Sequence, residues 1–318
     1  MNEYEYRTEA DLRARLRVGV IGGGVVGAAT AASWLEHSAG VAVWDLDERR
    51  RTCETPAEAW DSDLLFLCLP TNLAKPTDPG ADGYHSSLGL VHLLGAIGEL
   101  GEWLARNHGN NPAVIIKSTV PVATTALALK RLAEVSGRSQ DTLRVFHSPE
   151  FLTARCATVA ANIPTQVWLG SAEGSEDCPG GNVDRLRFGR TILRSIFNAR
   201  FPGVACYLTD ARTSELAKLA LNSFFALKVQ AFNVFESVAA HSGADWQDLR
   251  ALLIGDGRIS ANHTEVPGPD GLRGFGGACL PKDTHQMLLE CHNAGELAGE
   301  ALFEWVLDSR GGFRDGIQ

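Results

Sequence analysis

The sequence predicts an α/β protein in which a doubly wound parallel sheet is followed by an all-helical second domain with a long central helix. Three observations support this class. A glycine-rich turn near residue 22 joins an apolar strand to an alanine-rich helix. Later apolar runs show no alternation of apolar and polar residues, and from about residue 210 the apolar residues follow the period of a helix. Apolar runs without alternation are typical of parallel strands that are buried on both faces.

Composition narrows the possible partners. The chain has 318 residues, 45% hydrophobic and 21% charged, which is enough for about two domains. A formal net charge of -9 argues against a nucleic-acid or anionic-membrane partner. We find no signal peptide and no membrane span, so we expect a cytoplasmic protein. The seven cysteines and nine histidines show no ligand spacing, so we expect reduced thiols and no metal site.

The glycine-rich turn follows an expected strand at residues 17–22 and opens the next helix. Its residues are Gly22, Gly23, Gly24, Val25, Val26 and Gly27. Gly22 permits a tight turn, Gly24 lets backbone N–H groups reach a pyrophosphate, and Gly27 lets the helix approach the strand. The turn therefore predicts a Rossmann-type dinucleotide site. The alternative is a glycine-rich turn that binds nothing.

Residues at the ends of later strands refine this site. The next strand, at residues 40–45, ends in Asp45, whose carboxylate can accept from ribose hydroxyls and disfavours a 2′-phosphate, so we predict NAD rather than NADP. Strands expected at 63–69, 113–117 and 143–147 also end where ligands bind in open α/β sheets. The residues that follow the first two of these strands include Pro70, Thr71, Ser118 and Thr119.

The helical part carries two further candidates. Lys218 and Asn222 are four residues apart in a helix expected to run to about Ser242, so they share one face. They are either a solvated face or two donors aimed into a site. The stretch from Gly274 to Asp283 places Cys279 behind three glycines and before Lys282. A nearby cation favours the thiolate, which is the attacking species. The alternative is a glycine-rich turn with a buried cysteine.

Five motifs together resemble the UDP-glucose/GDP-mannose dehydrogenase family. They are the glycine turn, Lys117-Ser-Thr119-Val-Pro121, Ser148-Pro-Glu150-Phe-Leu152, Ser214-Glu-Leu-Ala-Lys218-Leu-Ala-Leu-Asn222, and Gly274-Phe-Gly-Gly-Ala-Cys279-Leu-Pro-Lys-Asp283. The residues themselves predict a polar lead-in at 1–15 and a frayed tail at 309–318. Between these segments, the resemblance implies an NAD-binding domain at 16–208 and a helical substrate and dimerisation domain at 209–308. It also implies a homodimer through the long helix.

The resemblance implies oxidation of a primary alcohol on a sugar through an aldehyde to a carboxylate, with two hydride transfers to NAD. By motif, Cys279 would form the thioester, while Lys218 and Asn222 would steady the oxyanion. The residues that would handle protons and water are Glu150, Thr119 and Asp283. The cofactor contacts would be Gly22, Gly24, Val25, Val26, Gly27, Asp45, Pro70, Thr71, Ser118, Thr119 and Lys282. The substrate contacts would be Glu150, Phe151, Leu152, Lys218, Asn222, Arg258, Phe275 and Gly276, with Arg258 reaching a neighbouring subunit's site.

Three departures from the family pattern leave the substrate open. Family members usually continue into a second Rossmann-like domain that grips the nucleotide, whereas this chain stops near that point. Ala154 replaces a usual acid, and Ala123 replaces a usual glycine. The substrate would be a nucleotide sugar, or a smaller or nucleoside-type alcohol. Two alternatives remain: a two-electron hydroxyacid-type dehydrogenase, which has no use for Cys279, and a non-catalytic NAD-binding protein.

Overall fold

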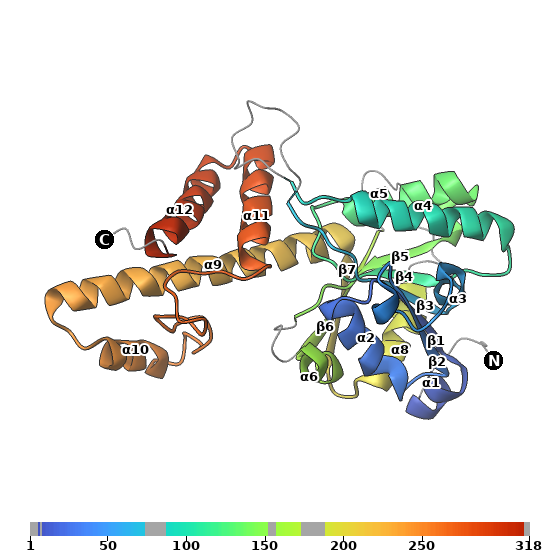
Figure 1. The fold of residues 1–318 in the computed structure, drawn as a ribbon, viewed down its shortest axis with the longest axis horizontal. Coiled ribbons are helices and arrows are strands. Elements are labelled where there is room, and N and C mark those ends of the chain that lie inside the picture. The colour runs from blue at the N-terminus through green and yellow to red at the C-terminus, as the bar shows by residue number, and fades with distance from the viewer. Residues whose placement is uncertain (1–5, 7, 74–86, 152–156, 173–187, 315–318) are drawn as a thin grey trace. The chain divides into compact units, whose positions relative to one another are not determined.

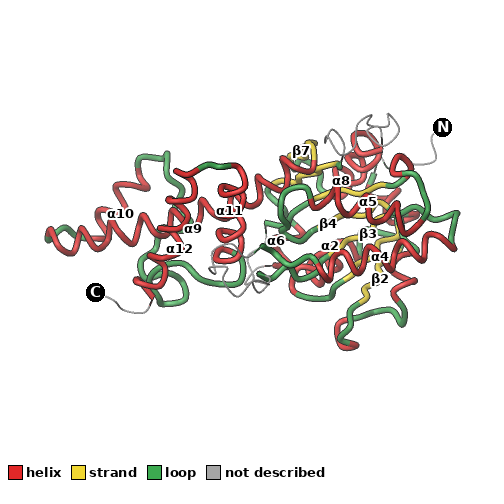
Figure 2. The backbone as a smooth tube through the Cα atoms, turned by 90° about the horizontal axis from the view of Figure 1, so that it is seen from above, coloured by secondary structure: helices red, strands yellow, loops and turns green. Residues whose placement is uncertain are grey.

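A computed structural model describes residue 6 and residues 8–73, 87–151, 157–172 and 188–314 (Figure 1). The chain forms two compact units. Unit 1 comprises Met1–Thr71 and Gly89–Leu216, and unit 2 comprises Asn72–Leu88 and Ala217–Gln318. Every strand, drawn yellow in Figure 2, belongs to unit 1, and the described part of unit 2 contains helices and loops.

Unit 1 is built on a seven-stranded sheet. Its strands are β1 (Arg17–Ile21), β2 (Gly40–Trp44), β3 (Leu64–Leu67), β4 (Ala113–Ile116), β5 (Arg144–His147), β6 (Gln166–Ser171) and β7 (Ala205–Asp210). Their order is β2-β1-β3-β4-β5-β6-β7. Pairing is parallel from β2 to β5, antiparallel between β5 and β6, and parallel between β6 and β7. The predicted doubly wound, mainly parallel sheet is confirmed, and the antiparallel pair and β7 are additions.

Helices cover both faces of this sheet. They are α1 (Glu9–Arg15), α2 (Val25–Leu35), α3 (Pro56–Trp60), α4 (Val91–Arg106), α5 (Thr124–Ser136), α6 (Ala157–Asn162) and α8 (Arg194–Arg200). Residues of α1, α2 and α8 share one core with Leu64 and Phe66 of β3, while residues of α3, α4 and α5 share the other core with Leu65 and Leu67. Successive residues of β3 thus enter two different cores. Both sets of side chains must be apolar, so the strand shows no alternation of apolar and polar residues.

The strand order also creates the ligand-binding edge of unit 1. The chain leaves β1 for β2 on one side and returns to β3 on the other side of β1. This reversal is the topological switch point at which doubly wound folds bind ligands, at the carboxyl ends of the strands. The turn from Gly22 to Gly27 leaves β1 at that point and opens α2.

Unit 2 is organised around a long helix. Its helices are α9 (Ala211–Ser242), whose first turn belongs to unit 1, α10 (Trp246–Gly255), α11 (Leu280–Ala294) and α12 (Leu297–Arg314). A small core joins α9, α11 and α12; it contains Ala226, Phe275, Leu288, Val306 and Leu307. None of the helices in the described ranges is both long enough and apolar enough to cross a membrane.

Two boundaries differ from the sequence expectation. The units part between Leu216 and Ala217, inside α9, rather than between residues 208 and 209. The first turn of α9 stays with unit 1 because Ser214 and Glu215 are buried there. Helix α12 extends to Arg314, into the segment expected to be frayed. It is held because Arg310 Nε donates to the carbonyl oxygen of Phe275 at 3.1 Å.

Candidate functional site

The glycine turn has the geometry that a pyrophosphate site needs. Gly22 has φ of 96°, and a Cβ there would lie 2.4 Å from the carbonyl oxygen of Cys68. A Cβ on Gly27 would lie 1.7 Å from the carbonyl oxygen of Gly22. A Cβ on Gly24 would meet nothing within 4 Å. Gly22 and Gly27 are therefore required by the fold, whereas Gly24 borders open space.

The first turn of α2 offers its backbone donors to that space. Gly24 caps this helix without a side-chain hydrogen bond, and Val25 beside it is exposed. Open N–H groups at a helix N-terminus favour a phosphate anion. Asp45 lies beside the turn, where Oδ2 accepts from Gly23 N at 2.6 Å and Oδ1 accepts from Asp47 N at 2.8 Å. Each carboxylate oxygen keeps a further lone pair for a ribose hydroxyl.

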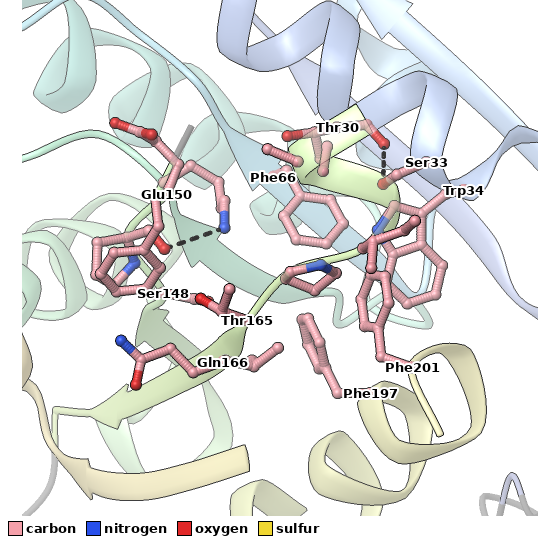
Figure 3. Close-up of a pocket in the computed structure, with 18 residues that line it drawn as sticks. Thr30, Ser33, Trp34, Phe66, Ser148, Glu150, Thr165, Gln166, Phe197 and Phe201 are labelled. Atoms are coloured by element: carbon pink, nitrogen blue, oxygen red, sulfur yellow. Dashed lines mark hydrogen bonds between the residues drawn. The ribbon is translucent and has the colours of Figure 1, made fainter. Parts of the chain in front are cut away.

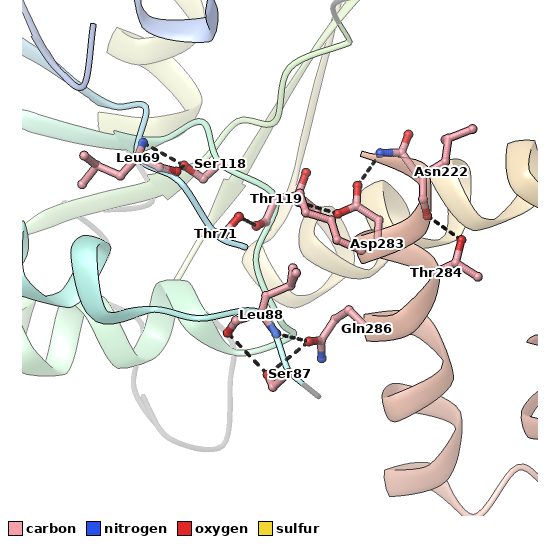
Figure 4. A network of polar contacts seen from close by, with 12 residues as sticks. Leu69, Thr71, Ser87, Leu88, Ser118, Thr119, Asn222, Asp283, Thr284 and Gln286 are labelled. Atoms are coloured by element: carbon pink, nitrogen blue, oxygen red, sulfur yellow. Dashed lines mark hydrogen bonds and ion pairs between the residues drawn. The ribbon is translucent and has the colours of Figure 1, made fainter. Parts of the chain in front are cut away.

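The loops after β3 and β4 are tied to each other (Figure 4). Ser118 Oγ donates to the carbonyl oxygen of Leu69 at 2.6 Å and accepts from Leu69 N at 3.1 Å. Thr71 Oγ1 donates to the carbonyl oxygen of Thr119 at 2.7 Å, and both threonines are buried. Pro70 is exposed between these ties. The predicted residues of these two loops therefore lie together at the carboxyl edge of the sheet.

Glu150 and Phe151 line a pocket of unit 1 of about 110 Å³ (Figure 3). Its other end is aromatic and is formed by Trp34, Phe66, Phe197 and Phe201. Figure 3 shows Glu150 at the opposite end of the pocket from Trp34 and Phe201. The Phe151 ring lies edge-on to Trp168, with 4.6 Å between centroids. Leu152 and Ala154 lie outside the described residues.

In unit 2, a buried polar network joins α9 to α11 (Figure 4). Asn222 Nδ2 donates to Asp283 Oδ2 at 2.5 Å, and Lys282 Nζ lies 2.6 Å from Asp283 Oδ1. Lys218 stands one turn before Asn222 on α9, and Lys218, Asn222 and Asp283 are all buried. The reading of Lys218 and Asn222 as a solvated helix face is therefore wrong.

Cys279 is the N-cap residue of α11 and is exposed. Asp283 N donates to the carbonyl oxygen of Cys279 at 3.0 Å, so this cysteine lies one turn from the buried network. The helix begins at Leu280, and Pro281 suits its first turn. The N-terminus of α11 favours negative charge on the neighbouring sulfur. The alternative of a buried cysteine is wrong.

The other described cysteines are poor nucleophiles by comparison. Burial raises the pKa of the Cys68 thiol to about 12. Burial also raises the pKa of Cys53, Cys206 and Cys291 above the ordinary thiol value. A thiol with a raised pKa forms little of the reactive thiolate near neutral pH. Cys279 is thus the exposed candidate among the cysteines in the described ranges.

Two predicted substrate residues have other partners. The ring of Phe275 is 2% exposed and lies in the core of unit 2, and its carbonyl oxygen accepts from Arg310. Arg258 follows α10, is exposed, and pairs with Asp256, with 2.9 Å between Nη2 and Oδ2. Gly276 is half-buried in the loop before Cys279. The guanidinium of Arg258 is therefore not part of the network around Asp283.

Supporting residues were missed by sequence reasoning. Asn233 Oδ1 accepts from Gly274 N at 3.0 Å and so holds the start of the loop that leads to Cys279. Gln286 Oε1 accepts from Ser87 Oγ at 3.1 Å and from Leu88 N at 2.9 Å (Figure 4). The sequence does carry one signal for Gln286: it lies one helical turn after Asp283 and so shares a face of α11 with it. Across the described ranges, no group of three His, Cys, Asp or Glu could hold a metal ion.

The switch-point turn and the acid after β2 define a dinucleotide-binding protein. The chain belongs to the UDP-glucose/GDP-mannose dehydrogenase family: residues 48–177 match the NAD binding domain of that family, and residues 212–304 match its central domain. The predicted cofactor, NAD, is confirmed by the domain match. UDP-glucose 6-dehydrogenase from Rhizobium meliloti (strain 1021) is 32% identical over 224 residues, covering 70% of this chain and 44% of that protein.

Solved structures agree on the fold. A UDP-glucose dehydrogenase from Pyrobaculum islandicum superposes with a TM-score of 0.72 at 25% identity, covering 93% of this chain and 68% of that one. 3-Hydroxyisobutyrate dehydrogenase from Mycobacterium tuberculosis superposes with a TM-score of 0.61 at 17% identity, covering 95% of this chain and 96% of that one. The chain spans about half the length of the curated relatives that it matches.

Proposed function

We propose that the chain oxidises a primary alcohol of a nucleotide sugar to a carboxylate in two NAD-dependent steps. The observation that carries this proposal is the exposed Cys279 at the N-terminus of α11, one turn from a buried network of Asp283, Asn222 and Lys282. A two-electron oxidation of an alcohol needs no thiol. A four-electron oxidation to an acid needs a group that holds the carbon between the two steps.

Each residue has a role that its chemistry suits. NAD, when bound, supplies the hydride acceptor for both oxidations. The Cys279 thiolate adds to the aldehyde carbon and forms a thiohemiacetal. Loss of hydride from that carbon leaves a thioester, and water then displaces the thiolate to give the carboxylate. Lys218 and Asn222 stabilise the oxyanion, where one positioned donor is worth ~2.7–4 kcal/mol.

Proton transfer is assigned to carboxylates and to one hydroxyl. Glu150, Thr119 and Asp283 accept the alcohol proton or activate the hydrolytic water. Glu150 is supported by its place in the lining of a partly apolar pocket, and Asp283 by its place in the buried network. Phe151, Leu152 and Gly276 would contact the sugar.

Counting NADH tests the proposal. UDP-glucose and GDP-mannose are supplied in limiting amount with excess NAD, and NADH is measured at the end of the reaction. We expect two NADH per acid formed. We expect Cys279→Ser to release one NADH and to accumulate aldehyde, which a hydrazine reagent traps. One NADH per product in the wild type, or full acid production by Cys279→Ser, contradicts the thioester route.

A two-electron hydroxyacid-type dehydrogenase is the second candidate. The superposition on a 3-hydroxyisobutyrate dehydrogenase supports a shared fold at 17% identity. That reaction leaves the exposed Cys279 without a role. It predicts that Cys279→Ser keeps wild-type turnover with a 3-hydroxyacid, which separates the two candidates.

A second copy of this chain is the proposed macromolecular partner. Leu216, Phe224, Phe235 and Val238 are exposed on one side of α9. Exposed apolar side chains gathered on one helix are typical of an interaction surface. Light scattering would show a dimer for the wild type and a monomer for Phe224→Glu. A monomeric wild type contradicts the proposal.

A further inference from the structure

We propose that Glu215 is a positioning residue for the reaction, because its carboxylate ties the first turn of α9 to the loop that carries Thr119. This inference rests on the proposed function. It adds a residue that holds reacting groups in place without contacting the substrate. The loop at issue comprises residues 119–123, between β4 and α5.

The contacts of Glu215 are short, buried and distant in sequence. Glu215 Oε2 accepts from Ala123 N at 2.7 Å, and Oε1 accepts from Thr125 N at 2.7 Å and from Thr125 Oγ1 at 2.5 Å. Glu215 is 0% exposed. The N-terminus of α5 has no side-chain cap of its own, so Glu215 supplies one from 90 residues away.

The loop of residues 119–123, which Glu215 binds at one end, is also held at its other end. Thr71 Oγ1 donates to the carbonyl oxygen of Thr119, at the start of the loop. Glu215 binds the end of the loop at Ala123, whose φ of 75° is unusual for a residue with a Cβ. Loss of either anchor would release the Thr119 backbone from a defined position.

Glu215 also lies in the first turn of α9, the helix that carries the proposed oxyanion donors Lys218 and Asn222. Lys218 and Asn222 follow Glu215 by three and seven residues on one continuous helix, so the three side chains share a face. The preceding Ser214 also holds this turn, since its Oγ lies 2.8 Å from His147 Nδ1. The first turn of α9 is therefore held within unit 1 by two side chains, Ser214 and Glu215.

Both carboxylate oxygens are needed as acceptors. Each oxygen receives a backbone N–H, one from Ala123 and one from Thr125. A glutamine amide has one acceptor oxygen and one NH₂ donor, so either orientation sets a donor against a backbone N–H. Glu215→Gln therefore breaks one tie with almost no change in volume.

The test compares Glu215→Gln and Thr125→Val with Thr213→Ser, an exposed change on the same turn that keeps the hydroxyl bonded to Asp210 and does not touch the contacts of Glu215. Turnover with UDP-glucose, NAD affinity and hydrogen exchange of residues 119–127 are measured on folded protein. We expect a fall of about 10-fold or more in kcat for the first two variants, because a misplacement of about 1 Å can cost on the order of 10²-fold. NAD affinity should fall less than kcat does, because Thr119 is one of several predicted cofactor contacts, and exchange of residues 119–127 should accelerate.

Turnover and hydrogen exchange each give a result that would overturn the proposal. Wild-type kcat per folded molecule in both variants, with only a lower melting temperature, assigns Glu215 a purely structural role. If Glu215→Gln does not fold, Thr125→Val decides alone, since it loses only the hydroxyl contact. If the wild type forms no NADH, the proposed function fails instead, and unchanged exchange of residues 119–127 in Thr125→Val then overturns the tie.

Discussion

The side-chain amide of Asn222 donates a hydrogen bond to the buried carboxylate of Asp283, with 2.5 Å between Nδ2 and Oδ2. The two residues are 61 positions apart in the chain. The second oxygen of Asp283 faces the ammonium of Lys282 at 2.6 Å. A fully buried carboxylate is stable only when such partners compensate its lost hydration. Asp283 therefore connects the helix of Cys279 with the helix of Lys218.

Asp283→Asn removes the charge and keeps the shape. We expect kcat to fall by about 10²-fold, the contribution of one positioned acid or base. Stability should also fall, because the ammonium of Lys282 loses its counter-ion. NADH formation and thermal unfolding measure the two effects. Glu304→Gln, an exposed change on α12, is the control. Unaltered turnover in Asp283→Asn would remove this residue from the reaction.

Two glycine variants separate folding from cofactor binding. Gly27→Ala should abolish folding, because its Cβ would lie 1.7 Å from the carbonyl oxygen of Gly22. Gly24→Ala should fold with an unchanged melting temperature, because its Cβ meets no atom within 4 Å. The same methyl group should weaken NAD binding, since it fills the space where a pyrophosphate approaches the backbone. Calorimetric titration with NAD checks this, and unweakened binding to Gly24→Ala would place the cofactor elsewhere.

Cysteine alkylation should follow exposure. Near neutral pH, iodoacetamide should modify Cys279 before the other cysteines that the structure describes, and turnover should fall at the same rate. Cys68 should resist, because burial raises its pKa to about 12. Peptide mass spectrometry over a time course reads the order. Faster modification of Cys53 or Cys206 than of Cys279 would contradict the assignment.

Ala123→Gly should stabilise the protein. Ala123 has φ of 75°, a left-handed conformation that costs a residue with a Cβ roughly 1–2 kcal/mol. Glycine loses more backbone freedom on folding, so the net gain should be about 0.5–1 kcal/mol. Urea unfolding measures the gain. Ala126→Gly within α5 should have the opposite sign, a loss of about 1 kcal/mol. Equal effects of the two variants would refute strain at Ala123.

Stability should depend on pH through Glu215. Burial raises the pKa of this carboxyl from 4.5 to about 7, against hydrogen bonds from Thr125 and Ala123 that lower it. Between these pH values Glu215 ionises more readily in the unfolded chain than in the folded chain, so stability falls as pH rises. At about 1.36 kcal/mol per pH unit, the loss is on the order of 3 kcal/mol.

The matched reference for this effect is Glu215→Gln, which does not titrate at that position. Free energies of unfolding for both proteins are measured in urea on either side of this pH window. The difference between wild type and variant should shrink toward the higher pH. A difference that is constant across the window would mean that the folded and unfolded carboxyls share one pKa.

Much of the fold could be predicted from local patterns. Each of the first five strands was found because its apolar residues are contiguous in the sequence. Strand β7 was missed, because it lies at the edge of the sheet and its residues alternate in burial rather than forming an apolar run. The start of α11 at Leu280 depends on tertiary structure as well, because Asp283 in its first turn is anchored by Asn222 of a distant helix.

The sequence by itself determined which chemical groups are available: the glycine turn, Asp45, Lys218, Asn222, Cys279 and Asp283. It also determined their spacing along single elements, because backbone periodicity relates residues only a few positions apart. Tertiary structure decided which of them meet. It directed the ring of Phe275 into a core, joined Asn222 to Asp283 across 61 positions, and joined Glu215 to Ala123 across 92 positions. Such contacts depend on how distant elements pack, and no local pattern encodes that.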